Sequence, residues 1–242
     1  SGGSISVFGR NADGSLDKIS QLIQHQGKAE NLQEKPVKSH AHQVQFSPDK
    51  KYIIATDLGE GQIYSYQYHP FNKEQTLILK NVIKTNPGSG PRHLTFSPNG
   101  KYAYLAHEVT GGISVFSYND GNLTKFQEIG TVEKNFSGKI HGADIHISAD
   151  GKFLYATNRG DLNTISLFSI AKDGHLTFIE TSSTLGKGPR NFVIDPSGKF
   201  LLVAHQYSND VVIFNRNKNT GKLTDSNKRI NVGTPVCLVF SK

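Results

Sequence analysis

The sequence predicts an all-β fold of the β-propeller class, and three observations lead to this prediction. One segment plan occurs four times, with repeats that start near residues 40, 90, 140 and 188. Each repeat has room for four short β-rich segments and shows no helical pattern, which is typical of a propeller blade. The period is regular, since intervals of 50, 51, 47 and 46 residues separate the equivalent positions Phe46, Phe96, Ile147, Ile194 and Phe240.

The elements follow this plan in order. Residues 5–8 match the third strand of later repeats, and residues 16–23 are expected to form a fourth, outer strand. The polar, aperiodic stretch 25–38 predicts a long loop. The first complete repeat follows with strands over 42–46, 52–55, 62–68 and 76–80.

These elements predict a single partial propeller domain over residues 1–242, which ends in a strand over 235–240. We expect seven four-stranded blades when the ring is complete, so that this chain covers about five blades and lacks N-terminal strands. A smaller ring that closes on this chain alone is the alternative.

A recurring turn favours the propeller over a β-sandwich. The first two strands of each repeat are separated by Ser-Pro-Asp-Lys at 47–50, Ser-Pro-Asn-Gly at 97–100, Ser-Ala-Asp-Gly at 148–151 and Asp-Pro-Ser-Gly at 195–198. A sandwich has no reason to repeat one turn in one slot. We expect these turns to be structural, because Pro fixes φ and Gly or Asp accepts the turn dihedrals.

Composition narrows the function classes. The formal charge is +7, but the lysines are scattered through turns without a basic helix or a nucleic-acid module, so no nucleic-acid partner is expected. No apolar run reaches the length of a membrane span, and we expect a soluble, cytoplasmic protein without a membrane partner. The single cysteine, Cys237, excludes an internal disulfide framework, and its apolar, strand-like surroundings predict a buried structural thiol.

The repeat also predicts a site. In a propeller the start of the first strand and the end of the second lie on one face of the ring. The starts and ends of the four repeats carry His, Arg, Asp, Glu, Asn and Gln side chains. Each of these residues alone has a structural alternative, such as capping a backbone group. Together they predict an anion-seeking mouth, because crowded ionisable groups are costly unless they are paired or used, and guanidinium groups match carboxylate and phosphate oxygens.

The ordered motifs SHAH at 39–42, GPRH at 90–93, HGADIH at 141–146 and GPRN at 188–191 resemble the seven-bladed β-propeller lactonase family, which includes bacterial 6-phosphogluconolactonases. The resemblance runs from Ser4 to the end of the chain. It implies a metal-independent hydrolase without a cofactor, which opens 6-phosphogluconolactone to 6-phosphogluconate in the pentose phosphate pathway of carbohydrate metabolism. The catalytic residues proposed for the family fall here on His42, Arg92, Glu108 and Arg159.

Lactone hydrolysis suggests roles for these residues. His42 or Glu108 would act as the general base on water, and Arg92 would stabilise the oxyanion. Arg159 and Arg190, with two nearby histidines, would hold the phosphate of a small anionic lactone. The predicted substrate-binding residues are His40, His93, His141, Asp144, His146, Arg190, Asn191 and His205.

Three alternatives remain at this point. A muconate-type lactonising enzyme of the same fold would use the arginines for carboxylates. A non-catalytic scaffold is possible because propellers host unrelated functions, although a scaffold would be expected to carry apolar and aromatic mouth residues. A metal-dependent lactonase would use oxygen ligands from Asp144, Asn158 and Asn191.

Overall fold

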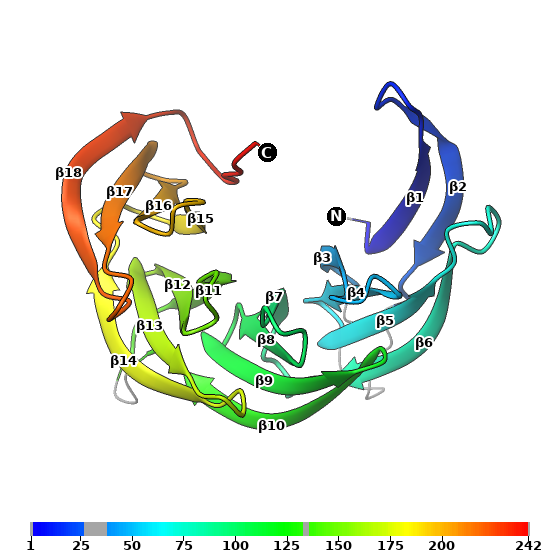
Figure 1. The fold of residues 1–242 in the computed structure, drawn as a ribbon, viewed down its shortest axis with the longest axis horizontal. Helices are drawn as coiled ribbons and strands as arrows, with labels where there is room; N and C mark the ends of the chain where they lie inside the picture. The colour runs from blue at the N-terminus through cyan, green and yellow to red at the C-terminus, as the bar shows by residue number, and fades with distance from the viewer. Residues whose placement is uncertain (1, 27–37, 133–135, 242) are drawn as a thin grey trace. The chain divides into compact units, whose positions relative to one another are not determined.

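The structure, a computed structural model, describes residues 2–26, 38–132 and 136–241. In these ranges the chain forms strands and no helix, as Figure 1 shows, which confirms the predicted all-β class. Accordingly, this part of the chain has no helix long and apolar enough to cross a membrane. Most of the loop predicted over 25–38 lies outside the described residues.

The strands form one two-stranded sheet and four four-stranded sheets in the described part of the chain. The two-stranded sheet joins β1 (Ser4–Arg10) and β2 (Leu16–Gln24). The first four-stranded sheet contains β3 (Ala41–Phe46), β4 (Tyr52–Asp57), β5 (Gln62–Tyr68) and β6 (Leu77–Lys84). The second contains β7 (Pro91–Phe96), β8 (Tyr102–His107), β9 (Gly112–Asn119) and β10 (Asn122–Gly130).

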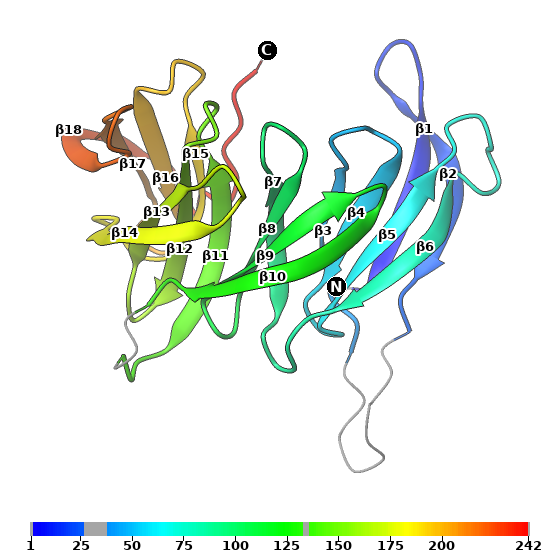
Figure 2. The ribbon, with the colours of Figure 1, turned by 60° about the horizontal axis from the view of Figure 1, so that its bottom comes forward.

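The remaining two sheets repeat this plan. One contains β11 (Ile140–Ile147), β12 (Phe153–Gly160), β13 (Thr164–Ile170) and β14 (Leu176–Ser183). The other contains β15 (Pro189–Ile194), β16 (Phe200–His205), β17 (Asp210–Arg216) and β18 (Leu223–Asn231). In each four-stranded sheet the strands lie side by side in chain order, a meander that can be followed in Figure 2. The four-stranded unit predicted from the repeat is therefore confirmed.

The described residues group into two compact units, Ser1–Pro91 with Tyr118–Leu123, and Arg92–Ser117 with Thr124–Lys242. The core of the first unit is built by β1, β4, β5 and the start of β6, with Ile5, Ile53 and Tyr66 among its buried side chains. The second unit has one cluster around Tyr104 and Phe168 and another around Phe192 and Phe214. The number of blades in a complete ring and a single domain over residues 1–242 remain predictions.

The recurring turns have the structural role that was expected of them. Ser97 Oγ donates to Asn99 Oδ1 (2.7 Å) and accepts from the Tyr102 backbone N–H (3.0 Å). The turns that begin at Ser47 and Ser148 have the same pattern. In the last turn the carboxylate of Asp195 takes the place of the serine and accepts from the Phe200 N–H at 2.7 Å.

Two sequence predictions are wrong near the C-terminus. In the described residues no strand covers 235–240, because strand structure requires a backbone ladder and the hydrogen bond of Leu238 N–H goes to the side-chain oxygen of Asn191 (2.6 Å). Cys237 is exposed rather than buried, since the segment that carries it packs in no sheet.

The registers explain how the sheets present a site. Ala41 pairs with Asp57, His141 with Arg159, and Pro189 with His205. The start of the first strand therefore faces the end of the second strand within each of these sheets, as the repeat predicted.

Candidate active site

A two-residue pattern recurs at or near the end of the second strand of each four-stranded sheet. The first residue of each pair is a polar side chain that is almost completely buried. These residues are Asp57, His107, Asn158 and His205, with exposures of 0%, 1%, 1% and 0%. The following residues are Leu58, Glu108, Arg159 and Gln206. Three of the four sheets thus present a polar side chain directly after the buried one, and these three side chains lie in the second unit.

Glu108 lies between two guanidinium groups. Its Oε2 accepts from Arg92 Nε at 2.8 Å and lies 3.3 Å from Arg159 NH2. Arg92, which is 1% exposed, also donates from NH1 to the backbone carbonyl of Ala143. Burial lowers the pKa of Arg92 to about 10, with the Arg159 charge acting in the same direction and Glu108 opposing it.

Arg159 is the less satisfied partner of this carboxylate. The residue is 7% exposed, and its Nε has no hydrogen-bond partner among the described residues. Burial lowers the pKa of Arg159, while Glu108 opposes the shift. A buried guanidinium N–H without an acceptor is costly, so a ligand oxygen would be stabilised there.

Arg190 repeats the position of Arg92 but not its charge balance. Arg92 lies sixteen residues before Glu108, and Arg190 lies sixteen residues before Gln206. Arg190 NH1 is 3.5 Å from Gln206 Oε1, a long contact to a neutral amide. The last sheet therefore supplies a half-buried cation without the carboxylate found in the second sheet. Gln206 is the glutamine that the strand-end motifs placed at the mouth, but no catalytic or binding role was predicted for it, although the matching segments AHE and AHQ would have suggested one.

Asp144 on β11 joins three sheets through its carboxylate. Oδ1 contacts His93 Nδ1 on β7 at 2.7 Å and accepts from the Ile145 N–H at 3.0 Å. Oδ2 lies 3.1 Å from His146 Nε2. It also accepts two hydrogen bonds from β15, from Asn191 Nδ2 at 2.6 Å and from the Phe192 N–H at 3.0 Å. Burial alone would raise the pKa of Asp144, but the hydrogen bonds and the two imidazoles hold it well below its usual range.

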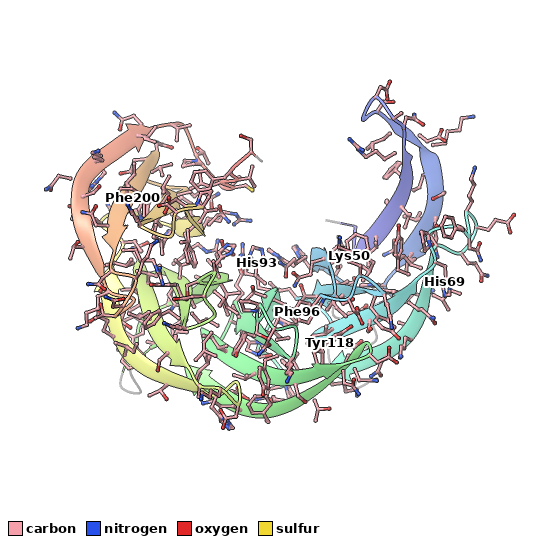
Figure 3. The ribbon with its side chains drawn as sticks, in the orientation of Figure 1. Lys50, His69, His93, Phe96, Tyr118 and Phe200 are labelled. Atoms are coloured by element: carbon pink, nitrogen blue, oxygen red, sulfur yellow. The ribbon has the colours of Figure 1, made fainter. Side chains whose placement is uncertain are left out.

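The two histidines on this carboxylate have different surroundings. His146 packs edge-on against Phe192 and is about two-fifths exposed. Burial opposes its protonation, but Asp144 outweighs burial and raises the pKa of His146. His93, labelled in Figure 3, is 22% exposed and also contacts Arg92 NH1 through Nε2 at 3.3 Å.

Two other predicted residues of the second unit differ in exposure. His141 is exposed and lies opposite Arg159 in the β11–β12 register. His205 is fully buried, with Nδ1 3.2 Å from Asp210 Oδ1, and a Cβ at Gly186 would lie 2.5 Å from its ring. Burial lowers the pKa of His205, which favours a neutral, packed imidazole. The substrate-binding roles given to these two histidines remain predictions.

The first unit holds His40 and His42 on or beside β3. His40 is exposed, His42 is half-buried, and their ring centroids lie 6.4 Å apart. Beneath them is a buried network that sequence reasoning missed. His25 contacts Asp57 Oδ2 and the Tyr66 hydroxyl, both at 2.8 Å, and Asp57 also accepts from Ser39 Oγ at 2.5 Å. His25 lies in a polar stretch without periodicity, so no pattern predicted its burial.

Most ligand atoms of the two candidate metal sets are held in hydrogen bonds, whereas Asn158 Oδ1 and Glu60 Oε1 have no partner among the described residues. The Asp144 oxygens are taken by five N–H donors or imidazoles, and Asn191 Oδ1 accepts from the Leu238 N–H. Ligand atoms of His25, Asp57 and Glu60 lie within 4.8 Å of one another, but His25 and Asp57 are already bonded to each other. The structure therefore favours hydrogen-bonded carboxylates at both places.

A comparison of the sequence with known protein families identifies the family of this chain. A family model described as lactonase, 7-bladed beta-propeller, matches residues 1–240. The chain belongs to this lactonase family. Proteins named 6-phosphogluconolactonase from Formosa agariphila and Bacillus subtilis are 41% and 35% identical to it, over 91% and 98% of the chain. The chain spans about two thirds of these relatives, 63% of the first and 67% of the second.

Solved structures of the family agree with the fold. The structure of a putative 6-phosphogluconolactonase from Bacteroides fragilis has a TM-score of 0.91 at 40% identity, covering 99% of this chain and 68% of that one. A periplasmic gluconolactonase from Pseudomonas aeruginosa has a TM-score of 0.93 at 37% identity, covering 99% of this chain and 66% of that one. The four-stranded sheets of this chain are thus the blades of a lactonase propeller.

Proposed function

We propose that the protein hydrolyses the lactone of an anionic sugar acid, with 6-phosphogluconolactone as the substrate and 6-phosphogluconate as the product, in the pentose phosphate pathway. The names of its relatives support the reaction class. The observation that carries the proposal is the imbalance of charge around Glu108, where three arginines of the second unit, Arg92, Arg159 and Arg190, have one glutamate among them.

The proposed roles follow from this imbalance. Arg92 is buried and paired with Glu108, so it would hold Glu108 in place, and its fixed guanidinium would stabilise the oxyanion without moving. Arg159 and Arg190 would bind the phosphate, supported by the unpartnered Arg159 Nε and by the neutral partner of Arg190. His42 and Glu108 are the predicted general bases. His141 and His146 are predicted to lie near the phosphate, and His40 and Asn191 are predicted substrate-binding residues.

The central experiment is a hydrolysis assay with the full-length protein on freshly made 6-phosphogluconolactone, corrected for spontaneous ring opening. We expect saturable hydrolysis that is unchanged by a chelator. Unphosphorylated gluconolactone and carboxymuconate are the comparison substrates. Faster turnover of carboxymuconate would identify the lactonising alternative, and no acceleration of any substrate would contradict the proposed function. A cytoplasmic location stays a prediction, which cell fractionation tests.

The phosphate subsite has its own test in Gln206→Glu. The new carboxylate would neutralise Arg190 as Glu108 neutralises Arg92. We expect KM for the phosphorylated lactone to rise about tenfold, which corresponds to about 1.4 kcal/mol of binding free energy, with little change for unphosphorylated gluconolactone.

The matched control for that variant is Gln67→Glu, which adds the same charge at an exposed position of β5. It should leave both substrates unaffected. An equal rise in KM for both lactones in Gln206→Glu would show that Arg190 does not recognise the phosphate.

A further inference from the structure

We propose that His93 is the general base of the hydrolysis and that Asp144 is the residue that positions it, in place of the His42 or Glu108 expected from the motifs. This inference rests on the proposed function. It is carried by a geometric juxtaposition in the second unit, where an imidazole on β7 and a buried carboxylate on β11 meet beside a guanidinium group.

The hydrogen bonds fix which nitrogen of His93 carries the proton. Nδ1 lies 2.7 Å from Asp144 Oδ1, and a carboxylate only accepts, so Nδ1 is the protonated nitrogen. Nε2 lies 3.3 Å from Arg92 NH1, and a guanidinium N–H only donates, so Nε2 presents its lone pair. Both contacts select the same neutral tautomer. A general base needs this state, in which Nε2 can accept a proton while the buried carboxylate holds the Nδ1–H.

Exposure separates the positioning group from the reacting group. The Asp144 side chain is 3% exposed and that of His93 is 22% exposed, so a water molecule reaches the imidazole and not the carboxylate. The contact between Nε2 and Arg92 NH1 is at the long end of the hydrogen-bond range, so water competes with it for the lone pair.

Glu108 is less suited to this step. Its Oε2 contacts Arg92 Nε and Arg159 NH2, so protonation of the carboxylate would remove the negative charge that both guanidinium groups are paired with. His146, the other imidazole on Asp144, has a raised pKa and is better suited to the role of a cation toward the substrate anion. One carboxylate therefore holds a base on one oxygen and a cation on the other.

The proposed step balances in atoms and charge. The oxygen of a water molecule attacks the lactone carbonyl carbon while His93 Nε2 takes one of its protons. The carbonyl oxygen becomes the oxyanion, which the adjacent guanidinium charge stabilises. The bond from this carbon to the ring oxygen then breaks, and the ring oxygen takes the proton back from Nε2. The product is the open hydroxy acid, and the imidazole is neutral again.

Several charged groups surround His93. Arg92 on its own strand contacts Nε2, and Asp144 on β11 contacts Nδ1. His146 on β11, Glu108 after β8, Arg159 on β12 and Arg190 on β15 complete the charged cluster. The pH profile of kcat therefore reflects all of these groups together. The base is identified by comparing this profile between the parent protein and a variant at position 93.

The test is the substitution His93→Gln, which keeps an N–H donor for Asp144 but cannot take a proton. We expect kcat for the phosphorylated lactone to fall 10²–10⁴-fold, the usual contribution of a general base. The acidic limb of the kcat–pH profile should disappear, with KM within about threefold of the original. His175→Gln is the matched control. His175 also pairs with an aspartate, Asp173, at 3.2 Å, and it lies half exposed in the turn before β14. It should change neither parameter.

Asp144→Asn tests the positioning role. The amide stabilises the wrong tautomer of His93, so kcat should fall while the acidic limb shifts. If the two residues act as one unit, the double variant His93→Gln/Asp144→Asn will be no slower than His93→Gln alone. Because Asp144 joins three sheets, its variant can fail to fold, and nitrogen NMR of the His93 ring in the unaltered protein then gives the tautomer directly.

The outcomes separate this inference from the proposed function. An active parent protein whose His93→Gln variant keeps both kcat and the acidic limb would overturn the role of His93 alone. A ring protonated on Nε2 in the NMR spectrum would also overturn it. A parent protein that accelerates no lactone would overturn the proposed function, and the role of His93 with it.

Discussion

At the scale of single residues, Arg92 shows how a side chain of the proposed site also holds the fold together. Its Nε bonds to Glu108 and its NH1 bonds to the Ala143 carbonyl, so it links the second and third sheets within one unit. A buried charge is tolerated only when its donors are satisfied. The forked guanidinium satisfies two acceptors in different directions, which a lysine ammonium on a flexible stem does poorly.

This difference predicts the effect of Arg92→Lys. The charge remains, but one of the two bonds is lost and a buried acceptor is left unpaired. We expect the free energy of unfolding to fall by about 1.5–3 kcal/mol, measured by urea denaturation. Arg190→Lys is the matched control, because Arg190 is half-buried and, among the described residues, makes one hydrogen bond, a 3.5 Å contact to Gln206. It should change stability by about 0.5 kcal/mol or less. Equal losses in the two variants would contradict a structural role for Arg92.

Sequence reasoning reached part of this residue-level arrangement. The contact between Arg92 and Glu108 lies within one repeat, and the common edge of its first two strands was enough to predict it. The contact between His93 and Asp144 crosses from one sheet to the next. It depends on side-chain direction and on the spacing of sheets, which a repeat count does not contain.

At the scale of elements, neighbouring sheets are locked by an aromatic ring over a glycine. The aromatic residue begins the second strand of one sheet, and the glycine lies in the outer hairpin turn of the next. A Cβ at Gly174 would lie 2.6 Å from the Tyr102 ring, and one at Gly221 would lie 2.7 Å from Phe153. Both glycines have positive φ, 86° and 75°, so conformation and space select glycine there.

The lock predicts a large effect for Gly174→Ala. Alanine would meet the Tyr102 ring and would also be strained at positive φ. Gly88→Ala is the control, since Gly88 has a φ of 71° but no atom of the described residues lies within 4 Å of its Cβ position. We expect Gly88→Ala to cost about 1 kcal/mol and Gly174→Ala about 1–3 kcal/mol more, measured by chemical denaturation. Equal costs would show that the ring moves aside freely.

The elements themselves were largely predictable because each carries a local signal. The turn at 97–100 and the strands on either side of it follow from alternation and turn chemistry, and β5 has the bounds that were predicted. The segment 235–240 has an equally strand-like composition but is not a strand in the described structure. A strand forms only where a neighbouring strand hydrogen-bonds to it, and the composition of a segment does not show whether such a neighbour is there.

At the scale of the whole molecule, burial of polar residues at the strand ends links the fold to pH. His107 is 1% exposed, and its Nε2 lies 2.8 Å from Ser114 Oγ. Burial lowers the pKa of His107 to about 4, with Glu128 opposing the shift. Burial also lowers the pKa of His205. Both imidazoles are thus kept neutral by the fold.

The sign of the effect follows from proton binding. In the unfolded chain a histidine takes up a proton as the pH falls through about 6.5. In the folded protein His107 takes up its proton only near pH 4, so between these values the unfolded state binds more protons. The stabilisation is complete above pH 6.5 and is lost as the pH falls to 4. A shift of this size corresponds to about 3 kcal/mol for His107. His107→Gln should therefore flatten the dependence of unfolding free energy on pH in this window, measured by urea denaturation at several pH values. The exposed His175→Gln should leave the slope intact, and an unchanged slope in His107→Gln would mean that the buried imidazole does not set the acid sensitivity of the fold.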